Sequence, residues 1–189
     1  MSKLETNQVD PATGTTLTLG TSGDTISIPS GVTLANSGTA TGFPDNKPLF
    51  YASLSANQSI SANTWTKITL DQEVFDADGV FASNKFTAPS AGKYFFVTSV
   101  RCNSPNTNEN FQSALYKNGS YFNGVGNARE YSPNGDEILL KCSVILSLAQ
   151  NDYIELYARA GGAGEDVAGS TAGSGEESYT AMQGMKIIE

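Results

Sequence analysis

Phe86-Thr87-Ala88-Pro89-Ser90-Ala91-Gly92-Lys93-Tyr94-Phe95-Phe96 is the stretch of sequence that indicates the fold most directly. Pro89 and Gly92 predict a reversal of the chain, because proline fixes its own φ and glycine adopts conformations closed to other residues. Aromatic and β-branched residues continue to Val100, and such residues favour strands. We therefore expect a hairpin here, at the centre of a β-sandwich around which most of the remaining chain packs.

The composition is typical of a turn-rich, all-β protein. Of the 189 residues, 39% are hydrophobic and only 16% are charged, and 19 are glycine. A chain of this length forms one domain with an appendage, or two small domains. Short strand patterns without a helical period then predict an antiparallel jelly-roll sandwich.

The charge and the lack of histidine exclude several functional classes. The formal net charge is −8, whereas phosphate binding requires clustered Lys and Arg, so we expect no nucleic-acid partner. The sequence contains no histidine, the commonest general base and metal ligand. We predict a protein that is not an enzyme and that has no catalytic residue, cofactor or bound metal.

The sequence gives no sign of a membrane segment. Residues 1–6 lack the apolar core of a secretory signal, and no apolar run approaches the length of a membrane span. We expect the chain to be made in a cytoplasm, to stay soluble and not to insert into a membrane.

The two cysteines, Cys102 and Cys142, stand in apolar strand patterns without a CxxC spacing. The simpler interpretation is two buried, small hydrophobic side chains. A disulfide between neighbouring strands is the alternative, because sequence gives no distance between them.

Two segments precede the main domain. Residues 1–14 are polar and aperiodic, and we expect an anchor arm that a partner surface orders. In residues 15–46 aliphatic residues alternate with Thr and Ser between Gly-containing turns. Copies of this segment are expected to pack face to face as a short β-rich stalk, through Leu17, Leu19, Ile26, Ile28, Val32 and Leu34. A flexible Ser/Thr/Gly linker is the alternative.

A Pro/Gly/Asn-rich break at residues 42–48 separates the stalk from a head domain, residues 47–189. Within the head, Asn118-Gly119 predicts a tight hairpin. Residues 138–148 are expected to alternate between the core and solvent, and residues 152–160 to point Glu155 and Arg159 outward. Residues 161–177 are glycine-rich and acidic, and predict a mobile, exposed loop.

The head resembles the complement C-one-q and tumour-necrosis-factor superfamily. The matching motif is Phe86, Gly92, Tyr94 and Phe96, with the family's spacing. Supporting positions are Phe50-Tyr51-Ala52, Tyr116-Lys117-Asn118-Gly119 and Asn151-Asp152-Tyr153-Ile154-Glu155-Leu156. The sequence departs from the family at Gly79 and Thr98, where aromatic residues are expected. The resemblance covers about residues 48–189 and implies a jelly-roll head that assembles as a homotrimer.

Residues 15–42 are similar to repeats in fibre and appendage proteins of tailed bacteriophages. The similar stretches are Thr16-Leu17-Thr18-Leu19-Gly20, Gly23-Asp24-Thr25-Ile26-Ser27-Ile28-Pro29-Ser30-Gly31 and Asn36-Ser37-Gly38-Thr39-Ala40. This resemblance implies a virion protein made in the host cytoplasm.

Two groups of side chains are candidate binding sites, each with a structural alternative. Tyr121, Phe122 and Tyr131 form a candidate ligand surface for a host glycan or protein, unless Tyr121 and Phe122 pack in the core or a trimer seam. Glu73, Asp76 and Asp78 offer oxygen ligands for calcium, but they lack the EF-hand spacing, and we expect a solvated acidic turn.

The sequence thus predicts a non-enzymatic virion structural protein of a tailed bacteriophage, a trimeric short fibre or surface decoration. Its arm would anchor to other virion proteins, and its head would contact the host surface or other virion proteins, with threefold symmetry multiplying weak contacts. A cellular C-one-q-like binding module is one alternative. A small carbohydrate hydrolase is another, although no catalytic pair stands out.

Overall fold

The computed structural model describes residues 9–38, 47–76, 78–103, 105, 108–122, 128–134, 136–170 and 180–187. The chain divides into two units, Met1–Phe43 and Pro44–Glu189. The second unit is the head, and all of the named strands belong to it.

Residues 9–38 of the first unit form turns and irregular backbone. Asp24 closes one turn, since its carboxylate accepts hydrogen bonds from the backbone N–H and the hydroxyl of Thr21. These bonds lower the pKa of Asp24. The predicted short strands do not form in the single chain, where the six aliphatic side chains are exposed, from 42% for Leu17 to 66% for Leu34. Their packing between copies remains a prediction.

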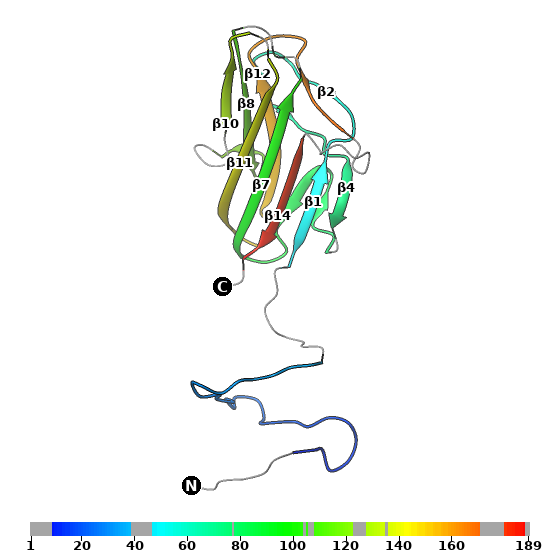
Figure 1. The fold of residues 1–189 in the computed structure, drawn as a ribbon, viewed down its shortest axis with the longest axis vertical. Coiled ribbons are helices and arrows are strands. Elements are labelled where there is room, and N and C mark those ends of the chain that lie inside the picture. The colour runs from blue at the N-terminus through cyan, green and yellow to red at the C-terminus, as the bar shows by residue number, and fades with distance from the viewer. Residues whose placement is uncertain are drawn as a thin grey trace. The chain divides into compact units, whose positions relative to one another are not determined.

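Sheet A contains the longest strands of the head. Its order is β2-β13-β7-β14-β1-β4, and β11 pairs with the other edge of β7. Figure 1 shows β11, β7, β14 and β1 side by side. The strands are β1 (Leu49–Ser53), β2 (Gln58–Ser59), β4 (Gln72–Asp76), β7 (Gly92–Cys102), β11 (Ile138–Leu148), β13 (Asp166–Val167) and β14 (Ala181–Lys186).

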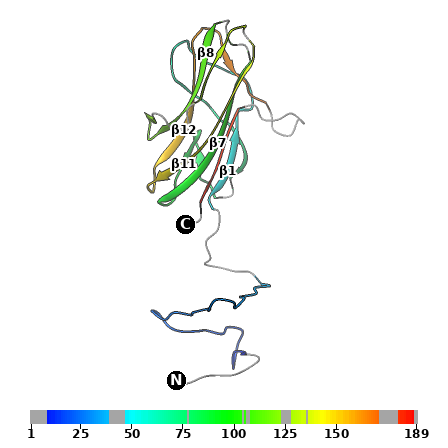
Figure 2. The ribbon, with the colours of Figure 1, turned by 60° about the vertical axis from the view of Figure 1, so that its left-hand side comes forward.

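Sheet B packs against sheet A, and the hydrophobic core lies between them (Figure 2). Its order is β10-β8-β12-β6-β5, with β3 paired to β12 and β9 to β8. The strands are β3 (Thr66–Lys67), β5 (Phe81–Ala82), β6 (Lys85–Thr87), β8 (Glu109–Lys117), β9 (Ser120–Tyr121), β10 (Ala128–Ser132) and β12 (Tyr153–Ala160). The paired strands of both sheets are antiparallel, so the predicted all-β sandwich is confirmed.

The hairpin predicted at Pro89–Gly92 is wrong, because β6 and β7 belong to different sheets. β6 pairs with β12 and β5, whereas β7 pairs with β11, β14 and β13. The turn carries the chain across the sandwich, so that Phe86 of one sheet meets Phe96 of the other with ring centroids 5.2 Å apart. The sequence pattern predicts that the chain turns here, but it does not indicate to which sheet the next strand belongs.

The three aromatic residues of the motif lie together in the core, and Gly92 lies at the turn beside them. Phe86, Tyr94 and Phe96 are fully buried, and the Phe50 ring stacks on that of Phe86 at 5.0 Å. The Tyr94 hydroxyl donates to the Ser90 carbonyl at 2.7 Å, which satisfies its polar end. Gly92 has a φ of +154°, and a Cβ there would lie 2.7 Å from Lys186 Cε. The motif therefore joins the two sheets at the turn between β6 and β7.

The prediction of an exposed loop over residues 161–177 is wrong for its middle part. Glu165, Val167 and Ala168 are fully buried. The Ala168 N–H donates to the Arg101 carbonyl at 2.7 Å, and the Ile60 N–H donates to the Glu165 carbonyl at 3.1 Å. The segment contains β13, which lies between β2 and β7 and supplies partners for their backbone groups. The composition of the segment does not reveal this pairing. Residues 171–177 of the predicted loop lie outside the described residues.

Other local predictions are confirmed. Asn118 and Gly119 have positive φ angles of 52° and 75°, as the two central residues of a type I′ turn require, and the turn joins β8 to β9. Along β11, Leu140, Leu146 and Leu148 are buried and Cys142 and Val144 are partly buried, while the alternate residues Lys141, Ser143, Ile145 and Ser147 are exposed.

Candidate functional site

An apolar row crosses the outer face of sheet A. On β7, Phe95 lies opposite Ile145 of β11 on one side and Met185 of β14 on the other. Leu49 of β1 lies opposite Met185. Directly opposed residues share a face, and Phe95 alternates with the buried Tyr94 and Phe96, so this row faces away from the core. We call Ile145, Phe95, Met185 and Leu49 the apolar row.

Further side chains extend this face two positions along the same strands. Val97 of β7 lies opposite Gln183, which lies opposite Tyr51. The Tyr51 ring contacts that of Phe75 on β4, with centroids 5.9 Å apart. A groove on this face is lined by Leu49, Phe95, Val97, Gln183, Gly184 and Met185.

The exposure of this face makes it a candidate protein interface. Ile145 is 56% exposed and Leu49 43% exposed. Contiguous apolar surface of this kind, bordered by polar residues such as Lys141 and Ser143, marks interaction sites in soluble proteins.

A second candidate surface is an aromatic cluster on the outer face of sheet B. The Tyr116 and Tyr157 rings stack with centroids 3.8 Å apart, and Trp65 lies 5.5 Å from Tyr121. Tyr121 itself is 43% exposed. Burial raises the pKa of both Tyr116 and Tyr157, and the neighbouring Tyr121 also raises that of Tyr116. Tyr116 and Tyr157 therefore present neutral phenol groups at physiological pH.

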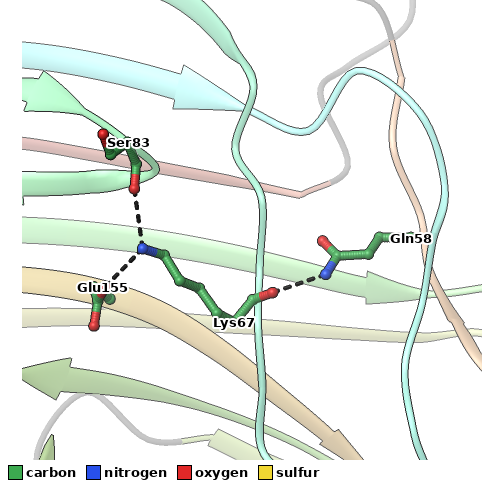
Figure 3. Close-up of polar contacts among 4 residues, drawn as sticks. All are labelled: Gln58, Lys67, Ser83 and Glu155. Atoms are coloured by element: carbon green, nitrogen blue, oxygen red, sulfur yellow. Dashed lines mark hydrogen bonds and ion pairs between the residues drawn. The ribbon is translucent and has the colours of Figure 1, made fainter. Parts of the chain in front are cut away.

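An ion pair fastens short strand β3 beside this cluster (Figure 3). Lys67 Nζ lies 2.6 Å from Glu155 Oε1 and donates to the Ser83 carbonyl at 3.0 Å. Gln58 Nε2 donates to the Lys67 carbonyl at 2.8 Å. Glu155 lies opposite Tyr116 on the outer face of the sheet, as predicted, but it is buried because Lys67 lies over it. A carboxylate near the surface is covered when a long lysine side chain lies over it.

The three predicted ligand residues do not come together. Tyr121 lies opposite Tyr116, whereas Tyr131 lies opposite Asn110, six positions away along β8. At the rise of a β-strand this separation is about 20 Å. Phe122 packs against the hydrophobic core.

The predicted acidic turn is engaged by its own backbone. The Asp76 carboxylate accepts hydrogen bonds from the N–H groups of Val80 and Phe81, at 3.0 and 2.8 Å. Among the described residues, no group of three or more His, Cys, Asp or Glu side chains is placed to hold a metal ion.

Neither Cys102 nor Cys142 is in a disulfide. Cys102 lies opposite Ile138 and Cys142 opposite Thr98, so four residue positions, about 13 Å, separate them along the β7–β11 pair. This exceeds the reach of a disulfide. Burial raises the pKa of Cys142.

Within the described part of the chain there is no helix with the length and hydropathy of a membrane span.

Comparison with known proteins finds no matching family model and no matching curated protein. Solved structures do match. The globular domain of a zebrafish complement 1qA protein is 16% identical with a TM-score of 0.53, covering 76% of this chain and 99% of that one. Murine APRIL at pH 5.0 is 12% identical with a TM-score of 0.54, covering 74% and 99%. Eiger TNF from S. frugiperda is 8% identical with a TM-score of 0.51, covering 76% and 95%. At these identities the likeness shows the fold, and the head of this chain is a jelly roll of the C-one-q and tumour-necrosis-factor type.

Proposed function

We propose that this chain is a non-enzymatic virion structural protein of a tailed bacteriophage. It forms a homotrimeric short fibre or surface decoration. The N-terminal arm, residues 1–14, anchors it to other virion proteins, and the jelly-roll head contacts the host surface or other virion proteins.

The apolar row is the observation that supports self-association most strongly. Four apolar side chains from four adjacent strands form one band on sheet A, and burying such area is worth about 25 cal/mol per Å². A closed symmetric assembly uses the same surface in every copy and so covers the band on all of them. The resemblance of the Phe86–Phe96 motif to trimeric jelly rolls makes three the expected number.

The N-terminal repeats support the virion role. The six aliphatic side chains of the stalk are exposed in the single chain, and neighbouring copies in a trimer would cover them. The similarity of residues 15–42 to repeats of phage fibre proteins is the sequence feature that supports a virion role.

Light scattering on the purified full chain tests the assembly. We expect about 60 kDa, three times the chain mass of 19.9 kDa. Because a charge in the apolar row cannot be buried between copies, Ile145→Lys and Phe95→Asp should reduce the mass to that of one chain while circular dichroism stays unchanged. Tyr121→Lys, at a similarly exposed position on sheet B, is the matched control and should stay trimeric. A wild-type mass of one chain would contradict the proposal.

Purified particles test the virion role. Antibody against the head should label phage particles at discrete positions in electron micrographs, and deletion of residues 1–14 should abolish the label without unfolding the head. Absence of the protein from purified particles would favour a cellular binding module instead. Turnover of a polysaccharide panel would favour a hydrolase.

A further inference from the structure

A polar pocket opens on sheet B, away from the apolar row. It is lined by Asn63, Glu109, Asn110, Gln112, Arg159 and Gly161. Arg159 of β12 lies opposite Gln112 of β8, so these two side chains share the outer face of the sheet. Burial of sheet A between copies would therefore leave this pocket open.

The pocket is built on fixed side chains. The backbone N–H of Asn63 donates to the Ala160 carbonyl at 2.8 Å, and its Nδ2 donates to the Gly161 carbonyl at 2.9 Å. These two bonds turn Asn63 Oδ1 toward Arg159, whose Nη2 donates to it at 3.2 Å. The guanidinium is thus held in place from one side.

The donors and acceptors of the pocket are incompletely used. Arg159 Nε is buried and makes no hydrogen bond, which costs stability on the order of 1–3 kcal/mol. The Glu109 carboxylate lies against Gly161 and has no hydrogen-bond partner among the side chains and backbone groups of the described residues. The Arg159 guanidinium and the Glu109 carboxylate thus both have unfilled hydrogen-bonding capacity in the same pocket. This combination suits a ligand that both accepts and donates hydrogen bonds.

Tyr131 is the aromatic residue next to the pocket. It lies on β10, opposite the pocket residue Asn110 of β8, and is 48% exposed. Its hydroxyl donates to Asn108 Oδ1 at 2.7 Å, which fixes the ring. An ordered, exposed aromatic face beside polar groups suits a ligand with one apolar face and several hydroxyl groups.

We infer that this pocket binds a neutral saccharide. Sugar hydroxyls donate to Glu109 and accept from Arg159 and the amides, while the C–H face of the ring packs on Tyr131. The Glu109 charge and the net charge of −8 disfavour acidic sugars. The inference rests on the proposed function, in which the head contacts a host surface, and it names the chemistry of that contact.

The position of the pocket agrees with this role. Lys186 and Ile187 donate backbone hydrogen bonds to Pro48 and Lys93, so the chain enters and leaves the head at the end where β7 begins. Strand β7 spans about 33 Å, from the end of the head where the chain enters to the opposite end (Figure 1). Glu109 is the first residue of β8, the next strand in the sequence. The pocket therefore lies at the end of the head opposite the chain entry.

Binding of the full chain to an array of neutral oligosaccharides, with sialylated and sulfated counterparts, tests the inference. The strongest neutral binder is then titrated calorimetrically. We expect Arg159→Gln and Glu109→Gln each to weaken binding about 10-fold or more, because each removes a hydrogen bond to a charged group. Lys85→Gln is the matched control. Lys85 is on β6 and lies over the ring of Tyr153 on β12, so this substitution should change the affinity less than about twofold.

Three results would overturn the inference: no neutral oligosaccharide bound by folded protein at millimolar concentration, binding unaffected by both substitutions, or binding of acidic glycans alone. Gln112→Leu, a change at a partly exposed position, replaces Arg159→Gln if that variant fails to fold. Light scattering on the same samples separates the two proposals. A trimer without sugar binding refutes only this inference, whereas a wild-type monomer refutes the proposed assembly.

Discussion

Asp152 links two turns at the residue scale. Its carboxylate accepts hydrogen bonds from Asn118 Nδ2 and from the Ala149 N–H, at 2.7 and 2.8 Å. Lys117 Nζ lies 2.7 Å from the same carboxylate. Asn118 in turn accepts a hydrogen bond from the Tyr153 N–H. The β8–β9 turn and the β11–β12 turn are thereby locked together through side chains that the sequence places 34 residues apart.

This network predicts a loss of stability in acid. The hydrogen bonds from Asn118, Lys117 and Ala149 lower the pKa of Asp152 from 3.8 to about 2. Because the pKa of Asp152 is lower in the folded than in the unfolded state, its ionised carboxylate stabilises the fold at pH values above the unfolded-state pKa of about 4. This stabilisation is lost as the pH falls from about 4 to 2. Denaturant titrations at several pH values should show that Asp152→Asn is less stable than the wild type at pH 7. The difference should shrink toward pH 2.

Glu130→Gln, at an exposed position on β10, is the control and should change the unfolding free energy at pH 7 by less than about 0.5 kcal/mol. A difference between wild type and Asp152→Asn that stays constant from pH 7 to pH 2 would show that the charge of Asp152 does not stabilise the fold.

At the scale of elements, β13 is a strand that was not predicted from the sequence. It pairs with β2 and β7, although its neighbours include Gly161, Gly162 and Gly164. Backbone hydrogen bonds to Arg101 and Leu54 hold the residues that follow it, Ala168 and Ser170. The segment therefore behaves as part of sheet A rather than as a loop.

Amide hydrogen exchange tests this assignment. The Ala168 amide should exchange on the order of 100-fold or more slowly than the amide of Gly164, which is exposed just before the strand. Mass spectrometry of peptides that cover residues 158–170 resolves the two sites. Equal, fast exchange at both would mean that β13 is not held in the sheet.

At the scale of the whole molecule, the head contains the hydrophobic core. Every residue of the core cluster lies between Phe50 and Met182. We therefore expect residues 47–189 alone to fold, with a thermal midpoint within about 5 °C of the full chain at equal protomer concentration. Because the apolar row belongs to the head, the truncated chain should also remain trimeric by light scattering. A folded but monomeric head would show that residues 1–46 drive assembly.

Much of the fold was predictable because strand patterns and turn residues are local. The alternation along β11 and the Asn118-Gly119 hairpin follow from periods and backbone preferences that each residue carries by itself. The pocket was not predictable, because Asn63, Glu109 and Arg159 are distant in sequence and share no motif. Of the predicted ligand residues, only Tyr131 lies next to it.

The Phe86–Phe96 stretch shows which features can be predicted from the sequence and which depend on the tertiary structure. The sequence by itself determined a jelly-roll class, a reversal at Pro89–Gly92 and buried aromatic positions, because these depend on local backbone and side-chain chemistry. Only the tertiary structure decided that β6 and β7 lie in opposite sheets, that β13 completes sheet A, and that an apolar row and a polar pocket occupy different faces. These choices depend on pairing between distant strands, and their free energy comes from contacts that no local pattern encodes.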